Sequence, residues 1–227
     1  MLQLYITNKN YSSWSLRPWL LAKELAIPFK EVLMPLAEGS SYAAFRAFSP
    51  TGRVPCLVDG QRVIWDSLAI TEYLAEHYPG VWPKDATARA FARSACCEMH
   101  SGFSALRTVC GMNCGVRIRL YGIAAALDSD IERIKALWLE GLSRFGGPFL
   151  AGAHFTAMDA FFAPVVSRFK TYGIGLDGAL ADYSARILAL PAMEQWYKEA
   201  LAEIWRESGH EAEALAAGEL LEDLRAV

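Results

Sequence analysis

The stretch of sequence that decides the fold is residues 52–70, which reads GRVPCLVDGQRVIWDSLAI. Two short runs of β-prone residues flank the pair Asp59–Gly60, and this pair is typical of a two-residue hairpin turn because both turn positions favour a positive φ. Asp66 and Ser67 then precede apolar residues at helical spacing, so they open a helix. The stretch therefore predicts a β-hairpin that leads directly into a helix.

The residues before this stretch predict a βαβ unit. Leu2–Ile6 and Phe29–Leu33 have the length and the apolar content of short strands, and the apolar residues from Leu16 onward recur at helical spacing. With the hairpin and its helix, the order becomes βαβ followed by ββα, which is the arrangement of a thioredoxin-like domain. We therefore expect an α/β domain over residues 1–78.

The start of the first helix is indicated by Pro18, because proline is tolerated only in the first turn of a helix. Two residues, Trp14 and Ser15, are then placed to cap it. Ser15 is the better cap, since its side chain can accept a hydrogen bond from a free backbone N–H. Ser12 and Ser13 are left in the loop that leads into the helix.

The clearest break in the chain is residues 78–83, YPGVWP, which place two prolines and a glycine within six residues. We expect a linker at residues 79–85. No run beyond the linker predicts a hairpin or a strand, so residues 86–227 are expected to form an all-helical domain. The helical patterns cover residues 86–126, 130–145, 156–172 and 191–204, and we expect the charged tail that follows them to be helical as well.

The composition argues against several classes of function. The net charge of −3 and the lack of a basic run speak against a nucleic-acid partner. No stretch reaches the ~18 uninterrupted apolar residues that a membrane span needs, and the N-terminus lacks the pattern of a signal peptide. The five cysteines are odd in number and lack metal-ligand spacing, which predicts free thiols, no metal site and a reducing, cytoplasmic compartment.

Four motifs, in this order and spacing, resemble those of the cytosolic glutathione S-transferases, and the resemblance extends over essentially the whole chain. They are YSSWSLR at residues 11–17, GRVP at 52–55, DSLAI at 66–70 and TAMD at 156–159. The first is similar to the active-site segment of serine-type, zeta-like bacterial members, although Trp14 stands where zeta-class proteins have a cysteine. The resemblance implies a thioredoxin-like domain followed by an all-α domain.

The same resemblance implies that the protein binds glutathione and activates its thiol. A thiol has a pKa near ~8.5, and lowering it by about two units takes roughly 2.7 kcal/mol of preferential interaction with the anion. The hydroxyl of Ser12, or alternatively of Ser13, and the positive end of the following helix can supply this interaction. The other implied glutathione contacts are a cis Val54–Pro55 for its cysteinyl backbone, Asp66 and Ser67 for its γ-glutamyl end, and Arg53 for its glycyl carboxylate.

The second substrate, a small apolar electrophile, is expected between the two domains. The residues expected to line its pocket are Trp14, His100, Phe103, Arg107, Met112, Asn113 and Arg168. The implied reaction transfers an alkyl or aryl group to the glutathione sulfur, without a metal, in a cytoplasmic homodimer that serves detoxification. Three alternatives stay open: a glutathione-dependent isomerase similar to maleylacetoacetate isomerase, a peroxidase, and a non-catalytic binding or regulatory protein with the same fold.

Overall fold

The structure is a computed structural model that describes residues 1–37 and 40–225, so the last two residues of the predicted second domain lie outside it. The N-terminal domain consists of β1 (Leu2–Ile6), α1 (Ser13–Glu24), β2 (Phe29–Leu33), α2 (Tyr42–Arg46), β3 (Cys56–Asp59), β4 (Arg62–Trp65) and α3 (Ser67–His77). The part that follows consists of α4 (Ala86–Ser101), α5 (Ser104–Val109), β5 (Val116–Leu120), α6 (Ala125–Phe145), α7 (Ala157–Thr171), α8 (Gly178–Leu188), α9 (Pro191–Ala202), α10 (Ser208–Ala217) and β6 (Gly218–Asp223).

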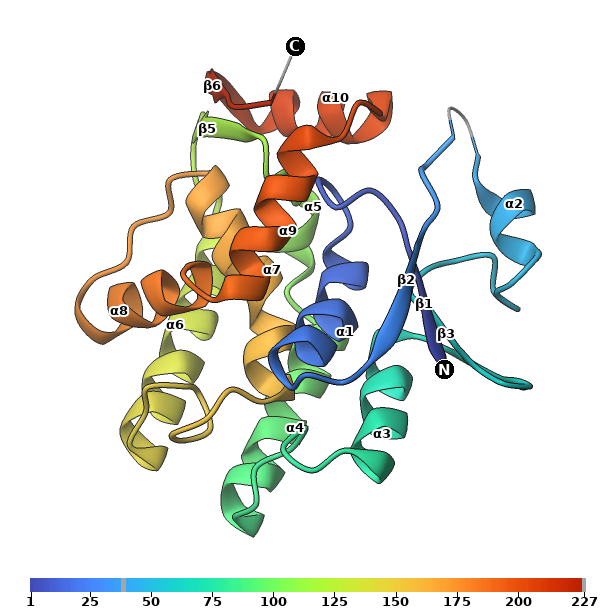
Figure 1. Ribbon diagram of the computed structural model, residues 1–227. Helices are drawn as coiled ribbons and strands as arrows, with labels where there is room; N and C mark the ends of the chain where they lie inside the picture. Colours follow the sequence, from blue (N-terminus) through green and yellow to red (C-terminus); the bar gives the residue numbers. More distant parts are fainter. Residues whose placement is uncertain (38–39, 226–227) are drawn as a thin grey trace.

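The N-terminal domain has a four-stranded sheet in the order β2-β1-β3-β4. β1 and β2 are parallel, while β3 runs antiparallel to both β1 and β4. α1 and α3 pack on one face of the sheet, and α2 lies on its other side (Figure 1). This arrangement confirms the thioredoxin-like order that the sequence predicts, with a helical region behind it.

The hairpin turn lies one residue later than predicted. Asp59 pairs with Arg62 across the ladder, so the turn residues are Gly60 and Gln61. Of these two, only Gly60 has a positive φ, at 59°. A hairpin turn that needs a positive φ at its first position alone is satisfied by one glycine, which frees Asp59 to extend the strand.

The first helix begins earlier than predicted, so the assignment of Ser15 as its N-cap is wrong. Ser12 is the N-cap, and its Oγ accepts the backbone N–H of Ser15 at 3.2 Å. Pro18 therefore lies inside the helix rather than in its first turn, where it leaves the carbonyl of Trp14 without its usual partner. A well-formed serine cap outweighs the positional preference of the proline.

The region after residue 85 is helical, as expected, but it also contains a short antiparallel ribbon of β5 and β6. The expectation that no strand follows residue 85 is therefore wrong. The sequence of β5, VRIRL, alternates apolar and charged residues, and Val116 and Ile118 are the buried ones. This period-two pattern is the signal that distinguishes a strand from the helix expected over residues 86–126. In that range, the chain leaves α4 at Gly102 and forms the separate helix α5.

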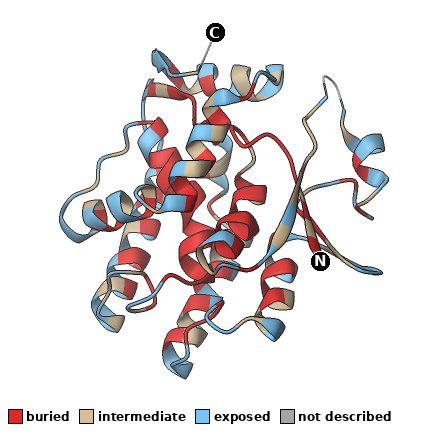
Figure 2. Cartoon of the chain, in the orientation of Figure 1, coloured by how far each residue is buried: buried red, intermediate tan, exposed pale blue. Residues whose placement is uncertain are grey.

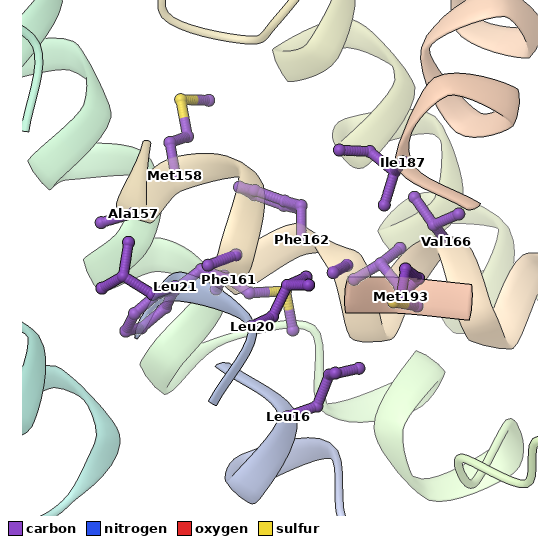
Figure 3. Close-up of a cluster of buried hydrophobic side chains, with 14 of the residues drawn as sticks. Leu16, Leu20, Leu21, Ala157, Met158, Phe161, Phe162, Val166, Ile187 and Met193 are labelled. Atoms are coloured by element: carbon purple, nitrogen blue, oxygen red, sulfur yellow. The ribbon is translucent and has the colours of Figure 1, made fainter. Parts of the chain in front are cut away.

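The two parts of the molecule share one hydrophobic core, with α7 at its centre (Figure 2). Every residue of α7 except Lys170 is buried. Leu20 and Leu21 of α1 lie close to Phe161 of α7 in Figure 3, and Leu16 belongs to the same core. The N-terminal domain is thus packed onto the helical region by a continuous apolar interface. No helix in the described part of the chain is long and apolar enough to cross a membrane.

The start of α7 is fixed by a capping box, as the motif TAMD predicts. The carboxylate of Asp159 accepts the backbone N–H of Thr156 at 2.9 Å and that of Leu150 at 3.0 Å. Asp159 is fully buried, and burial raises its pKa to about 6 in spite of these donors. The central helix therefore depends on one buried carboxyl group for its first turn and for the loop before it.

We expect Asp159→Ala to lower the free energy of unfolding by about 3 kcal/mol. The substitution leaves two buried backbone donors unpaired, at about 1–3 kcal/mol each, and removes part of a helix cap. Urea unfolding followed by tryptophan fluorescence measures the change. Asp128→Ala, which removes an exposed acid from the first turn of α6, is the matched control and should cost less than about 1 kcal/mol. Equal losses in the two variants would contradict this account.

Candidate active site

A cleft of about 920 Å³ lies between the two parts of the molecule. It brings together most of the residues that the sequence singles out. Those that line it are Ser12, Ser13, Trp14, Arg53, Val54, Arg107, Met112 and Arg168. Six predicted residues do not line it, namely Pro55, which is buried beside Val54, and Asp66, Ser67, His100, Phe103 and Asn113.

Ser12 and Ser13 stand where the loop after β1 turns into α1. The backbone N–H of Ser12 donates to the carbonyl of Asn8 at 2.9 Å, which closes the loop into a turn. Ser12 caps the helix, and Ser13 is its first residue. Both hydroxyls therefore lie beside the free N–H groups and the positive dipole end of α1, an arrangement that favours an anion in the cleft.

The loop before these serines is anchored by Lys9, whose side chain is almost completely buried. Its ammonium forms ion pairs with Glu31 of β2, at 2.7 Å, and with Glu199 of α9. It also lies 4.7 Å from the ring centroid of Trp19 and 5.4 Å from that of Trp196. One cation thus joins β2, α1 and α9 directly behind the site, and no local sequence pattern indicates it.

The chain beyond α9 holds the same loop from the other side. The carboxylate of Glu203 accepts the backbone N–H of Lys9 at 2.6 Å and that of Asn10 at 3.2 Å. The hydroxyl of Tyr11 donates to Glu211 on α10, and burial and this contact raise the pKa of Tyr11 to about 12. Glu211 in turn accepts a hydrogen bond of 3.0 Å from Arg225.

Helix α10 forms part of the cleft wall. The sequence indicates a helical tail there but assigns it no role. The ring of His210 stacks on Tyr11 with its centroid 5.1 Å away, and its Nδ1 lies 2.6 Å from the carboxylate of Glu207. Glu207, His210 and Glu213 all line the cleft. The C-terminal segment is therefore a component of the site.

Three guanidinium groups gather around one wall of the cleft. Arg17 lies 4.3 Å from the ring centroid of Trp14 and 4.8 Å from that of Phe161, and Arg107 lies 4.6 Å from Trp14. Burial and the like charges of Arg168 and Arg107 lower the pKa of Arg17 to about 9. Within residues 1–37 and 40–225, none of the three arginines pairs with a carboxylate at ion-pair distance. Arg17 belongs to the quoted motif YSSWSLR, yet sequence reasoning gives it no function.

The residues expected at the γ-glutamyl end of the site, Asp66 and Ser67, lie at the start of α3 and do not line the cleft. Asp66 is the N-cap of α3 with a φ of 76°, and its exposed carboxylate lies 3.3 Å from Nε2 of His100. Ser67 is fully buried, and its Oγ accepts a hydrogen bond of 3.4 Å from Arg17. Burial lowers the pKa of His100, with Asp66 acting in the opposite direction.

The loop before β3 carries the remaining predicted contacts. The Val54–Pro55 peptide bond is cis, as the family resemblance implies. Val54 is half-buried and Arg53 is exposed, and both face the cleft. In the described part of the chain, no group of three or more His, Cys, Asp or Glu side chains could hold a metal ion. The chemistry that this arrangement offers is anion binding at a helix start, with serine hydroxyls as donors.

Comparison with known proteins identifies the family. Residues 11–77 match the family model for the glutathione S-transferase N-terminal domain, and residues 119–199 match the model for the C-terminal domain of the same family. The chain is 28% identical to glutathione S-transferase T1 of Arabidopsis thaliana over 64% of this chain and 65% of the relative, so the match spans just under two thirds of that relative. It is also 28% identical to a probable maleylacetoacetate isomerase of Caenorhabditis elegans, over 83% of this chain and 92% of the relative.

Solved structures share the fold. A glutathione transferase homolog from Burkholderia with bound glutathione superposes with a TM-score of 0.66 at 24% identity, over 88% of this chain and 97% of that one. A theta-class glutathione S-transferase from Xanthomonas axonopodis with glutathione bound gives 0.63 at 23% identity, over 86% and 96%. Since the two matched models together span well over half of the chain, the chain belongs to the glutathione S-transferase family.

Proposed function

We propose that this protein is a glutathione S-transferase, which binds glutathione in the cleft between the domains and activates its thiol for attack on a small electrophile. The observation that carries the proposal is the pair of serine hydroxyls, Ser12 and Ser13, at the N-terminal end of α1 in a cleft of about 920 Å³. Relatives of the same family and fold, two of them with bound glutathione, support it.

The activation of the thiol follows from its surroundings. Attack requires the thiolate, and a free thiol with a pKa near ~8.5 is mostly protonated at neutral pH. The first N–H groups of α1 and a serine hydroxyl both interact better with the anion than with the neutral thiol. Binding then aligns the sulfur with the electrophile, which replaces an encounter of two free molecules by a reaction within one complex.

The proposed contacts of glutathione follow the two sides of the cleft. The backbone of Val54 pairs with the cysteinyl residue, and the exposed side chain of Arg53 meets the glycyl carboxylate. The γ-glutamyl end would extend beyond the cleft lining to the start of α3, where the exposed Asp66 carboxylate takes its ammonium group and the backbone N–H of the buried Ser67 takes its carboxylate. In this pose the ammonium group of the ligand competes with His100, whose Nε2 lies 3.3 Å from the Asp66 carboxylate.

The proposed electrophile site lies against α5. The indole of Trp14 and the side chain of Met112 offer apolar surface to a small compound, and both line the cleft. His100 stands edge-on to Trp14 at 5.2 Å, behind the wall. Phe103 and Asn113 are buried at 6% and 1% exposure, so their proposed part is to support this wall.

A second candidate is a glutathione-dependent isomerase, and one observation favours it. Arg107 and Arg168 line the cleft without a carboxylate partner in the described part of the chain, which suits an acidic second substrate. Two relatives named as probable maleylacetoacetate isomerases point the same way. This isomerase would use the same thiolate and a different electrophile.

The cellular setting is proposed from the composition and the fold. All five cysteines are free, which fits a reducing, cytoplasmic compartment. Trp65 and Val63 are exposed on the edge strand β4, and they suit the interface of a homodimer. Detoxification of small reactive compounds is the corresponding role.

We expect the thiol of bound glutathione to have a pKa about two units below its free value. Because the thiolate is the nucleophile, kcat/KM for the electrophile at saturating glutathione should rise with pH through this lowered pKa and then level off. The double variant Ser12→Ala/Ser13→Ala should move the inflection up by about one unit or more, since only the helix end then remains. Conjugation of halogenated aromatics, epoxides and isothiocyanates, followed against pH, gives the profile.

The control for this experiment is retention on immobilised glutathione. The double variant should still bind, because most of the proposed contacts lie elsewhere. If the unaltered protein fails to bind at millimolar glutathione, the protein is a non-catalytic relative and the proposed function is wrong. Reduction of hydroperoxides in the same panel tests for the peroxidase alternative.

The isomerase candidate predicts a selective effect of Arg107→Gln. Removing a cation from the cleft should lower kcat/KM for isomerisation of maleylacetoacetate about tenfold or more, which corresponds to about 1.4 kcal/mol. The same change should affect conjugation of a neutral aromatic halide much less. A parallel fall in both activities would argue against an acidic substrate, and an undetectable isomerase activity in the unaltered protein would eliminate the candidate.

A further inference from the structure

The two serine hydroxyls at the start of α1 differ in how their protons are used. Ser12 Oγ accepts the backbone N–H of Ser15 and donates its own proton to Ser15 Oγ at 2.8 Å. Ser15 is fully buried, so this contact is closed to solvent. Because a serine hydroxyl has a single proton, that of Ser12 is used inside the protein, in the helix cap.

Ser13 has the opposite arrangement. Nη2 of Arg168 lies 3.3 Å from Ser13 Oγ. A guanidinium group can only donate, so the serine oxygen is the acceptor in this contact. Among residues 1–37 and 40–225, none accepts the proton of Ser13, whose side chain lines the cleft. That proton is therefore free for a ligand in the cleft.

The guanidinium of Arg168 is fixed in place. Its Nε donates to the carbonyl of Cys110 at 2.7 Å and its Nη1 to that of Pro164 at 3.4 Å, so two further contacts set its orientation. It is 5% exposed, and burial together with the like charge of Arg107 lowers its pKa to about 10. The charge has no carboxylate within ion-pair distance in the described part of the chain.

A charged donor strengthens the hydroxyl that it contacts. A hydrogen bond from a cation polarises the acceptor's own O–H, and this effect grows where water is excluded. Ser13 therefore combines a free proton with an activating partner. Ser12 has neither, since its partners are a neutral backbone amide and a neutral hydroxyl.

We propose that Arg168 is the positioning residue of the thiol-activating serine: by donating to Ser13 Oγ it directs the Ser13 proton toward the sulfur of glutathione, while Ser12 serves as the helix cap. The inference rests on the proposed binding of glutathione in this cleft. The thiol loses its proton to solvent, and the thiolate that remains accepts the hydrogen bond from Ser13. The roles of the two neighbouring serines are thus separated by their partners.

The test is the pKa of the thiol of bound glutathione, measured by the ultraviolet absorbance of the thiolate against pH. Ser13→Ala and Arg168→Met should each raise this pKa by about one unit or more. The pKa in Arg168→Lys should lie between those of Arg168→Met and the unaltered protein, because lysine keeps the positive charge but loses the planar arrangement of donors. The double variant Ser13→Ala/Arg168→Met should show little more than the larger single effect. Ser12→Ala should reduce the free energy of unfolding by about 1 kcal/mol through the lost cap, and it should raise the thiol pKa by less than Ser13→Ala does.

Arg107→Met is the matched control, because Arg107 also lines the cleft but donates to the carbonyl of His100 instead of a serine. The effect of Arg107→Met on the thiol pKa should be the same in the unaltered protein and in the Ser13→Ala background. An effect of Arg168→Met that persists in full in the Ser13→Ala background would overturn the proposal, as would a larger pKa change in Ser12→Ala than in Ser13→Ala.

If Arg168→Met fails to fold, the single serine variants decide the question. An unchanged thiol pKa in Ser13→Ala is then enough to reject the role proposed for Ser13 and Arg168. Failure of the proposed function is a distinct result: the unaltered protein would bind no glutathione, or would bind it with the thiol pKa of the free peptide, and the inference would fall with it.

Discussion

The ion pairs of Lys9 hold together the part of the molecule on which the site depends. A lysine at this depth needs charged partners, because an unpaired buried ammonium group costs far more than a hydrogen bond returns. Glu31 and Glu199 supply them, and two indole rings cover the same ammonium. Because Glu31 and Glu199 are partly exposed, the two ion pairs add little net stability, but without them the buried ammonium group would be uncompensated. They tie the loop that ends in Ser12 to β2 and α9.

Helix α7 links the stability of the fold to the chemistry of the site. Its first turn depends on the buried carboxyl of Asp159, and its middle forms the core against α1. Near its last turn it carries Arg168, which reaches Ser13 at the start of α1. A helix packed on all sides cannot shift without loss of core contacts. The guanidinium therefore meets Ser13 in a fixed geometry, as a preorganised donor must.

The features that the sequence predicts well are those with a local cause. The hairpin, the βαβ unit and the capping box at residues 156–159 each follow from turn, period or cap chemistry within a few residues. The errors arise where two local signals compete. At α1 the cap formed by Ser12 overrides Pro18, and in β5 a clear alternation is hidden in an alanine-rich surrounding that favours a helix.

Contacts between residues far apart in the chain cannot be predicted from local sequence patterns. Glu203 binds the backbone of Lys9 from a position 194 residues away, and Arg168 reaches Ser13 over 155 residues. Neither contact leaves a local pattern, since a buried carboxylate or guanidinium in a helix resembles any surface charge in the sequence. The role of the serines could be expected in general, but the division between them depends on partners that only the folded chain brings together.

The contacts proposed for glutathione can be predicted from this sequence more readily than those proposed for the second substrate. Ser12, Ser13, Arg53, Val54 and Arg168 fall within the two stretches that match the family models. Other lining residues come from α5, the loop after it and the segment at α10, which lie outside both stretches, and they are Arg107, Met112, Glu207, His210 and Glu213. The residues proposed to contact glutathione therefore lie within the family matches, while part of the lining proposed for the electrophile lies outside them. The guanidinium groups lie near Ser13 and the acidic residues lie at α10, so the electrostatic field in the cleft is directed from the arginines toward α10. In the isomerase proposed above, such a field would orient the acidic second substrate with its negative group toward the arginines.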